Sequence, residues 1–241
     1  MNIPGLISQL IGIKTLRLTD VSSIDKNVFL FSFNHEVDVL WVWERRPWSF
    51  KGEHLILKKY DPEWSLNEVD FSTTDFWVQS HGLPLNRQFD SSVRKIRRMI
   101  GEVLDVDLIG SGVGSCKRFV RVRVRLDVHK PLPMGFPLDR KPIHPLWIQF
   151  KFEKLGLFCY GCGMLGHDIK DCVDVEVQKL WRERVMMGIH GSWLRSEVSE
   201  FQPGIDLDEL ENSYHFECIR PDEAGPSIPK TQTQSPWIIA V

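Results

Sequence analysis

The chain has 241 residues, of which 42% are hydrophobic and 26% charged, so it can build one large hydrophobic core or two small ones. Its nine Trp and fourteen Phe residues exclude disorder along the whole length, because that much aromatic surface has to be buried. No stretch approaches the roughly 20 apolar residues of a membrane span, and residues 1–13 lack the positive charge of a secretory signal.

The net charge of −2 conceals an asymmetry between the body and the C-terminal tail. Residues 173–241 hold 6 Lys and Arg against 12 Asp and Glu, a balance of −6, so residues 1–172 carry +4. This basic excess favours a polyanionic partner only weakly. Five cysteines, three of them within fourteen residues, favour reduced thiols and a metal site over a disulfide framework. We therefore expect a reducing compartment, the nucleus or the cytoplasm.

A first α+β unit is expected within residues 1–61. Its pattern predicts, in order, a strand, a strand, a helix and a strand at 14–20, 27–33, 34–46 and 54–60. Asn34 is the expected N-cap of the helix, and Pro47 ends it. Val37, Leu40 and Trp41 are expected to share its buried face.

A second unit is expected within residues 75–152. Its predicted elements are a strand at 75–80, a helix at 90–104, a short strand at 106–109, and strands at 118–128 and 146–152, the last after a proline-rich loop at 130–145. Helices alternating with hairpins predict an α+β fold of two split-βαβ units, ferredoxin-like or RNA-recognition-like. The acidic, proline-rich segment 174–241 is expected to be mostly disordered, with one helix near 175–189.

The strongest motif is the run CYGCGMLGHDIKDC, inside a small module expected at residues 153–173. Its C-x2-C-x4-H-x4-C spacing offers a Cys3His ligand set for Zn²⁺ through Cys159, Cys162, His167 and Cys172. Gly163 and Gly166 stand where the backbone has to turn around the metal. Three thiolates and one imidazole leave no open coordination position, so the set predicts a structural metal and no enzyme activity. The spacing and the two glycines disfavour the alternative of incidental cysteines beside a surface histidine.

This run resembles a CCHC zinc knuckle of the retroviral nucleocapsid and retrotransposon type. Such a resemblance implies that exposed bases of single-stranded nucleic acid stack on aromatic or apolar side chains. Tyr160 occupies the usual aromatic position, Ile169 is the nearest match to the second apolar position, and Lys170 is the basic residue of the loop.

The runs FLFSF, RRPWSFKGEHLILKKY, FWVQSHGLPLN and FVRVRVRLDVHKPLPMGFPL also resemble a plant family derived from LINE retrotransposons. In that family a domain of unknown function precedes the knuckle, and the likeness covers roughly residues 20–172. The resemblance implies zinc, nucleic-acid binding, an RNA-recognition-like first domain and no established enzymatic activity. A strand and a helix normally precede the equivalent of Lys14, so we expect the first unit to be truncated.

The strand at 118–128 alternates basic and apolar residues. Phe119, Arg121, Arg123 and Arg125 share one face, and the valines share the other. One interpretation is a platform that contacts phosphates and stacks bases. The alternatives are a charged edge strand, or arginines paired with acids on a neighbouring strand.

The sequence therefore predicts a zinc-dependent, non-enzymatic protein that binds single-stranded RNA or DNA. The alternative is a protein-interaction module in which the knuckle only folds the chain. Neither interpretation includes a membrane or a small-molecule substrate.

Overall fold

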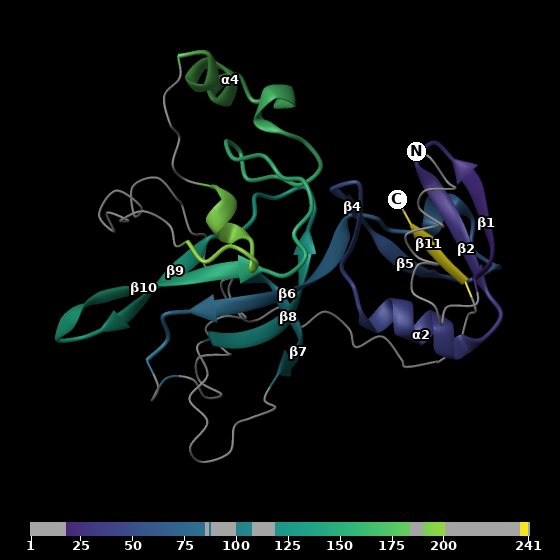
Figure 1. The fold of residues 1–241 in the computed structure, drawn as a ribbon, viewed down its shortest axis with the longest axis horizontal. Coiled ribbons are helices and arrows are strands. Elements are labelled where there is room, and N and C mark those ends of the chain that lie inside the picture. Colours follow the sequence, from purple (N-terminus) through teal and green to yellow (C-terminus); the bar gives the residue numbers. More distant parts are fainter. Residues whose placement is uncertain are drawn as a thin grey trace. The chain divides into compact units, whose positions relative to one another are not determined.

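The computed structural model describes residues 18–84, 87, 100–107, 119–183, 190–200 and 237–240. Figure 1 shows the elements in chain order. The helices and strands are β1 (Leu18–Asp25), β2 (Val28–Phe33), α2 (Glu36–Glu44), β3 (Trp48–Phe50), β4 (Glu53–Leu55), β5 (Leu57–Tyr60), β6 (Thr73–His81), β7 (Glu102–Asp107), β8 (Phe119–Asp127), β9 (Gly135–Arg140), β10 (Ile143–Phe152), α4 (Val175–Arg182) and β11 (Trp237–Ala240), with short 3-10 turns η1 (Leu66–Glu68), η3 (Ile169–Asp171) and η4 (Ser192–Leu194). The described residues fall into two compact units, one within 1–74 and 224–241 and the other within 75–223.

The first unit is built on a four-stranded sheet in the order β1-β2-β11-β5. β1 and β2 form an antiparallel hairpin, and β11 pairs antiparallel with both β2 and β5. The aromatic residues of β2 alternate, so Phe29, Phe31 and Phe33 are all buried in the core of this unit. β11 comes from the segment that was expected to be disordered, which corrects that prediction for residues 237–240.

The helix expected at 34–46 is present as α2, but it buries a different face. Val37 and Leu40, which the periodicity placed inside, are 73% and 42% exposed. Val39 and Val42 are buried instead. The helix carries apolar residues on nearly all sides, so its own pattern does not select a face, and packing against the sheet decides.

The start of α2 also differs from expectation. His35, in extended conformation, is the N-cap in place of Asn34, and its side chain makes no capping hydrogen bond. Glu36 and Asp38 in that turn offset the positive end of the helix dipole. Pro47 follows the helix as expected.

The strand expected at 54–60 is two strands in different sheets. β4 pairs with β3 as a small hairpin, while β5 forms the edge of the four-stranded sheet. The turn of that hairpin is made by Lys51 and Gly52, both with positive φ. The hydrophobic pattern runs through both strands without a break, which is why the sequence indicated a single element.

The second unit contains a five-stranded sheet in the order β7-β8-β6-β10-β9. β8 lies between β6 and β7 in this order. The expected split-βαβ arrangement also requires a helix between β6 and β7. Most of the helix expected at 90–104 lies outside the described residues, so ferredoxin-like packing stays a prediction. Its last residues are corrected, because β7 begins at Glu102, directly after Gly101 with φ +132°. The strands at 118–128 and 146–152 are confirmed as β8 and β10.

The proline-rich loop expected at 130–145 is largely a hairpin. β9 pairs antiparallel with β10, and the pairing register shifts between Ile143 and Leu146. Pro137 is tolerated because β9 is the edge strand of the sheet, where a missing N–H need not break a ladder. The core of this unit contains the valines of β8 and the phenylalanines of β10. Val122, Phe150 and Phe152 among them are fully buried.

Two further stretches of the expected tail are ordered. α4 covers the first half of the helix predicted near 175–189. Residues 190–200 lie on the second unit: Leu194 joins its core, and the Lys151 ammonium donates to the Val198 and Glu200 carbonyls at 2.5 and 2.7 Å. Among the helices that the structure describes, none has the length and apolar composition to cross a membrane.

Candidate metal centre

The four predicted ligands converge. The ligand atoms of Cys159, Cys162, His167 and Cys172 all lie within 4.8 Å of one another. The Cys162 Sγ atom is 3.4 Å from His167 Nε2. A tetrahedral ion with Zn–S bonds of about 2.3 Å and Zn–N bonds of about 2.0 Å would separate these two atoms by roughly 3.5 Å. The cluster is therefore positioned to bind a metal ion, and its donor set fits Zn²⁺ as a structural metal.

The first half of the site is a tight turn around Cys159. Its amide donates to the Met164 carbonyl at 2.9 Å, and the Gly163 amide donates to its carbonyl at 2.9 Å. The amides of Gly161 and Cys162 point at its Sγ atom, at 3.4 and 3.5 Å, where they stabilise a thiolate. Gly163 and Gly166 have φ values of +76° and +90°, which confirms the need for glycine at both positions.

Two thiols of the site, those of Cys162 and Cys172, favour the protonated form in the absence of a bound cation. Burial, together with the neighbouring Cys159 sulfur, raises the pKa of the Cys162 thiol to about 12. Burial also raises the pKa of Cys172 above its ordinary value. Metal binding therefore has to displace these protons, so the affinity for Zn²⁺ rises with pH.

The second half of the site is the 3-10 turn η3, which leads into Cys172. The Asp168 carboxylate accepts from the Lys170 amide at 3.2 Å, and the Asp171 amide donates to the Asp168 carbonyl at 3.0 Å. Asp168 therefore acts as the cap of this turn.

Helix α4 forms part of the centre, which the sequence reasoning missed. Its Val177 is buried together with Cys159 and Cys172, and a Cβ added at Gly161 would meet Val177 Cγ1 at 2.3 Å. Asp174 caps the helix by accepting from the Glu176 and Val177 amides.

Gln178 of the same helix closes the last turn of the knuckle. Its side-chain amide donates to the carbonyls of Ile169, Lys170 and Cys172, at 3.0, 3.2 and 2.9 Å. The helix itself was predicted near 175–189, and only its contact with the metal centre was not. Asp174, two residues beyond the last ligand, was the available sequence sign that the helix begins directly after the knuckle.

The knuckle is also attached to the second unit. Phe158 belongs to the core of that unit, and the Leu132 amide donates to the Gly163 carbonyl at 2.9 Å. The His190 ring lies against Gly163, where a Cβ would meet its Nε2 atom at 2.3 Å. Burial lowers the pKa of His190, so the ring is neutral and its Nε2–H can donate to the Leu132 carbonyl at 3.2 Å. The metal centre is therefore anchored to a folded body through its first turn.

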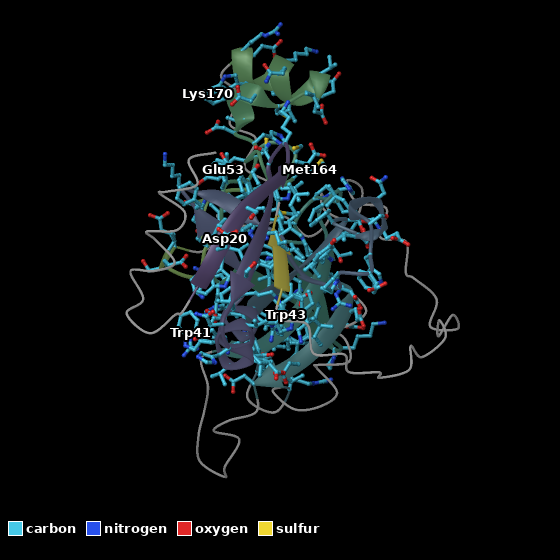
Figure 2. All side chains as sticks on the ribbon, turned by 90° about the vertical axis from the view of Figure 1, so that its right-hand side faces the viewer. Asp20, Trp41, Trp43, Glu53, Met164 and Lys170 are labelled. Carbon is cyan, nitrogen blue, oxygen red and sulfur yellow. The ribbon has the colours of Figure 1, made fainter. Side chains whose placement is uncertain are left out.

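The residues predicted to meet bases lie on the knuckle with different exposure. Tyr160 is 40% exposed, and its ring lies 5.0 Å from that of Phe158. Ile169 is half-buried against the cysteine and Val177 cluster. Lys170 is exposed on η3 (Figure 2).

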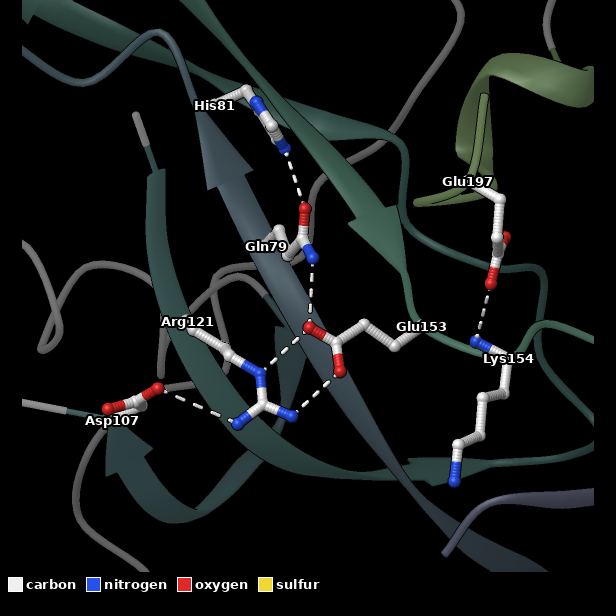
Figure 3. Close-up of polar contacts among 7 residues, drawn as sticks. All are labelled: Gln79, His81, Asp107, Arg121, Glu153, Lys154 and Glu197. Carbon is white, nitrogen blue, oxygen red and sulfur yellow. Dashed lines mark hydrogen bonds and ion pairs between the residues drawn. The ribbon is translucent and has the colours of Figure 1, made fainter. Parts of the chain in front are cut away.

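The arginines of β8 lie on one face, as expected, and two of them are paired with acids. Arg121 makes a bidentate contact with Glu153, at 2.8 and 2.7 Å, and lies 3.6 Å from Asp107 (Figure 3). Gln79 donates to the same Glu153 carboxylate at 2.9 Å. Burial by itself raises the pKa of Glu153, but the hydrogen bonds from Arg121 and Gln79 outweigh it, so the pKa is lowered.

Arg125 pairs in the same way, with Asp75 at 3.2 Å and Glu102 at 3.1 Å. Arg123 is 6% exposed, and its guanidinium lies 5.8 Å from the Trp77 ring centroid. These contacts correspond to the alternative in which the arginines pair with acids on neighbouring strands.

Aromatic rings complete this face. The Arg121 guanidinium lies 3.8 Å from the Trp77 ring centroid, and the Phe119 ring lies 4.9 Å from that of His81. Burial, with the nearby charge of Lys151, lowers the pKa of His81 to about 4, so this ring is neutral at neutral pH. On this face of β8 and β6, the charges of Arg121 and Arg125 are thus matched by carboxylates of the same unit.

Comparison with known proteins finds two family matches along the chain. Residues 126–174 match the zinc knuckle family, and residues 7–68 match a family described as a domain of unknown function (DUF4283). The chain is 22% identical over 146 residues to uncharacterized protein At4g02000 of Arabidopsis thaliana, which covers 61% of the chain and 46% of that protein. The match therefore spans less than half of the relative's length. No solved structure matches the chain. The chain thus carries a region matching DUF4283 followed by a CCHC zinc knuckle.

Proposed function

We propose that this protein is a zinc-dependent, non-enzymatic protein that binds single-stranded RNA or DNA. The observation that carries the proposal is the closed Cys3His cluster of a zinc knuckle with an exposed aromatic ring beside its first ligand. The ligand set leaves no open position for substrate, which supports a structural role for the ion. The proposal includes a reducing compartment, the nucleus or the cytoplasm, and the three free thiols of the site support it.

The binding surface of this proposal is the knuckle. Tyr160 offers its ring to a base, and the exposed Lys170 ammonium offers one contact to a phosphate. Ile169 adds an apolar edge, although its partial burial limits what it can contact. The arginines of β8 add less than their number implies, because Arg121 and Arg125 already have carboxylate partners.

Origin from a plant LINE retrotransposon is also part of the proposal. It is supported by the order of the two regions, a DUF4283 match before a zinc knuckle, and by the likeness to a plant protein.

Fluorescence anisotropy with labelled single-stranded oligonucleotides tests the proposed function. Binding is expected to weaken with salt, with a slope of about −0.7 per neutralised phosphate in a plot of log affinity against log salt. Tyr160→Ala should reduce affinity by about 5- to 150-fold, since stacking on one base is worth about 1–3 kcal/mol. Tyr160→Phe, which keeps the ring, is the matched control, and both variants must retain stoichiometric zinc.

A protein-interaction module, in which the knuckle only folds the chain, is the second candidate. The ion pairs of Arg121 and Arg125 bear on it only by weakening the phosphate contacts expected of the first candidate. Under that candidate, the zinc-loaded protein shows no oligonucleotide binding at low salt. Equal affinity of Tyr160→Ala and Tyr160→Phe would likewise remove the knuckle surface from nucleic-acid binding and leave the zinc as a folding element.

A further inference from the structure

The strand β11 occupies an unusual place in the first unit. It lies between β2 and β5 and pairs antiparallel with each of them (Figure 1, yellow). In the backbone register, Trp237 pairs with Ser32 on one side and Tyr60 on the other, and Ala240 pairs with Phe29 and Leu57. The four residues of β11 therefore match the full length of β5.

This strand reaches its place from far along the chain. Trp237 comes 177 positions after Tyr60, and the described elements between them, apart from η1 and the start of β6, belong to the second unit. Closing a connection of that length costs conformational entropy, although the cost rises only slowly with length. The pairing of β11 with its two neighbours, rather than the tether, must hold it.

The gap that β11 fills has the properties of a strand-binding site. β2 carries the buried side chains of Phe29, Phe31 and Phe33, and β5 carries the buried Leu57. Without β11, each of these strands presents an edge of unpaired N–H and C=O groups beside the core of the unit. An extended apolar segment can satisfy both edges at once, whereas recognition at a sheet edge satisfies only one.

We propose that the gap between β2 and β5 is a strand-acceptor site for an extended apolar segment. Residues 237–240, of sequence WIIA, are its ligand, bound in cis. A four-residue strand forms few main-chain hydrogen bonds, so this ligand exchanges with the same segment supplied in trans. The proposal is independent of zinc and of nucleic-acid binding.

The test uses the full chain with Ile239→Pro, because proline removes an N–H from the middle of β11 and disfavours a strand paired on both sides. Ile239→Val, which keeps the N–H and the β-branched side chain, is the matched control. The probe is a fluorescein-labelled peptide of residues 235–241, SPWIIAV. Its Kd for the Ile239→Pro chain should be at least about tenfold lower than for the unaltered chain or the Ile239→Val chain, because in those two chains residues 237–240 compete for the same gap from within the molecule.

Hydrogen exchange on the unaltered chain gives a second, independent readout. Fragments covering 237–240 and 57–60 should be protected, and Ile239→Pro should remove the protection of both while the labelled peptide restores it in 57–60. Equal peptide affinity for all three chains, or exchange of 237–240 in the unaltered chain as fast as in the free peptide, would overturn the proposal. Zinc content is measured for every chain. Stoichiometric zinc shows that the knuckle is folded, so a negative result then concerns the strand-acceptor site alone.

Discussion

The zinc knuckle and the N-terminal sheet each bring separate residues together, but over very different lengths of chain. The knuckle brings four ligand atoms to within 4.8 Å of one another, and all four come from residues 159–172. The N-terminal sheet places β11 beside β2, although Trp237 and Ser32 are more than 200 residues apart. A bound ion can fold the knuckle, because its ligands are close together in the sequence. The N-terminal sheet instead depends on strand pairing and burial contributed by distant segments. The two regions should therefore respond to different perturbations.

Removal of the metal should have the largest effect, and it should be confined to the knuckle. Cys159→Ser or chelation is expected to remove stoichiometric zinc and a binding free energy on the order of 10 kcal/mol. Hydrogen exchange should then accelerate across 159–183, including α4, because Val177 packs on the cysteines. Protection of 28–33 should not change.

Cys218→Ser, a cysteine outside the ligand set, is the control for that experiment. Loss of hydrogen-exchange protection in β2 on chelation would show that the knuckle and the N-terminal sheet fold as one cooperative unit, contrary to this prediction.

Phe31→Ala should have the reciprocal effect. Phe31 is 3% exposed in the core of the first unit, and truncating a buried phenylalanine costs about 3–5 kcal/mol. We expect the unfolding midpoint of the first unit to fall while zinc content, measured by mass spectrometry, stays stoichiometric. Ile24→Ala, at a side chain that is 43% exposed on β1, should change stability by less than about 0.5 kcal/mol.

Gly163→Ala should test how firmly the knuckle is attached to the second unit. The position combines a φ of +76° with a Cβ contact of 2.3 Å to the His190 ring, so a cost of about 2–3 kcal/mol is expected. Gly166→Ala is the matched control, because its φ is +90° but open space surrounds its Cβ. Denaturant unfolding at saturating zinc should separate the two variants, and equal losses would show that backbone strain alone matters.

Glu153→Gln should have the smallest effect and a definite pH dependence. The lowered pKa of Glu153 means that its charged form stabilises the folded chain above the unfolded-state pKa, near 4.5, and that this stability is lost as the pH falls through the folded-state pKa. The difference in unfolding free energy between the unaltered chain and Glu153→Gln should be about 1 kcal/mol at pH 7 and should vanish in acid.

The matched control for that variant is Glu197→Gln, which removes an exposed carboxylate bonded to the Lys154 amide (Figure 3). A pH-independent difference for Glu153→Gln would contradict the role of the Arg121 ion pair.

The predicted elements of the N-terminal region show where sequence patterns stop being informative. The strand at 27–33 and the helix at 34–46 were found, because alternation and a proline stop are local features. The buried face of the helix was not, because apolar side chains surround α2 and Val39 was no more favoured than Val37 by its own pattern. The break between β4 and β5 falls within one continuous apolar run, and only the separate partners of the two strands reveal it.

At the metal centre the division is similar. The ligand set and both turning glycines follow from the spacing of one short run, because Zn²⁺ accepts these atom types in a narrow geometry. The same run did not reveal that α4 covers Gly161, since contact between a helix and a turn depends on how both are packed.

The sequence by itself therefore determined the features that depend only on residues close together in the chain: a Cys3His site, alternating strands and a helix before a proline. The tertiary structure alone decided that the β8 arginines meet carboxylates, that His190 rests on Gly163, and that residues 237–240 enter a sheet begun more than 200 residues earlier. The physical reason is that local spacing fixes bond geometry, whereas these contacts depend on burial and pairing summed over segments that meet only in the folded chain.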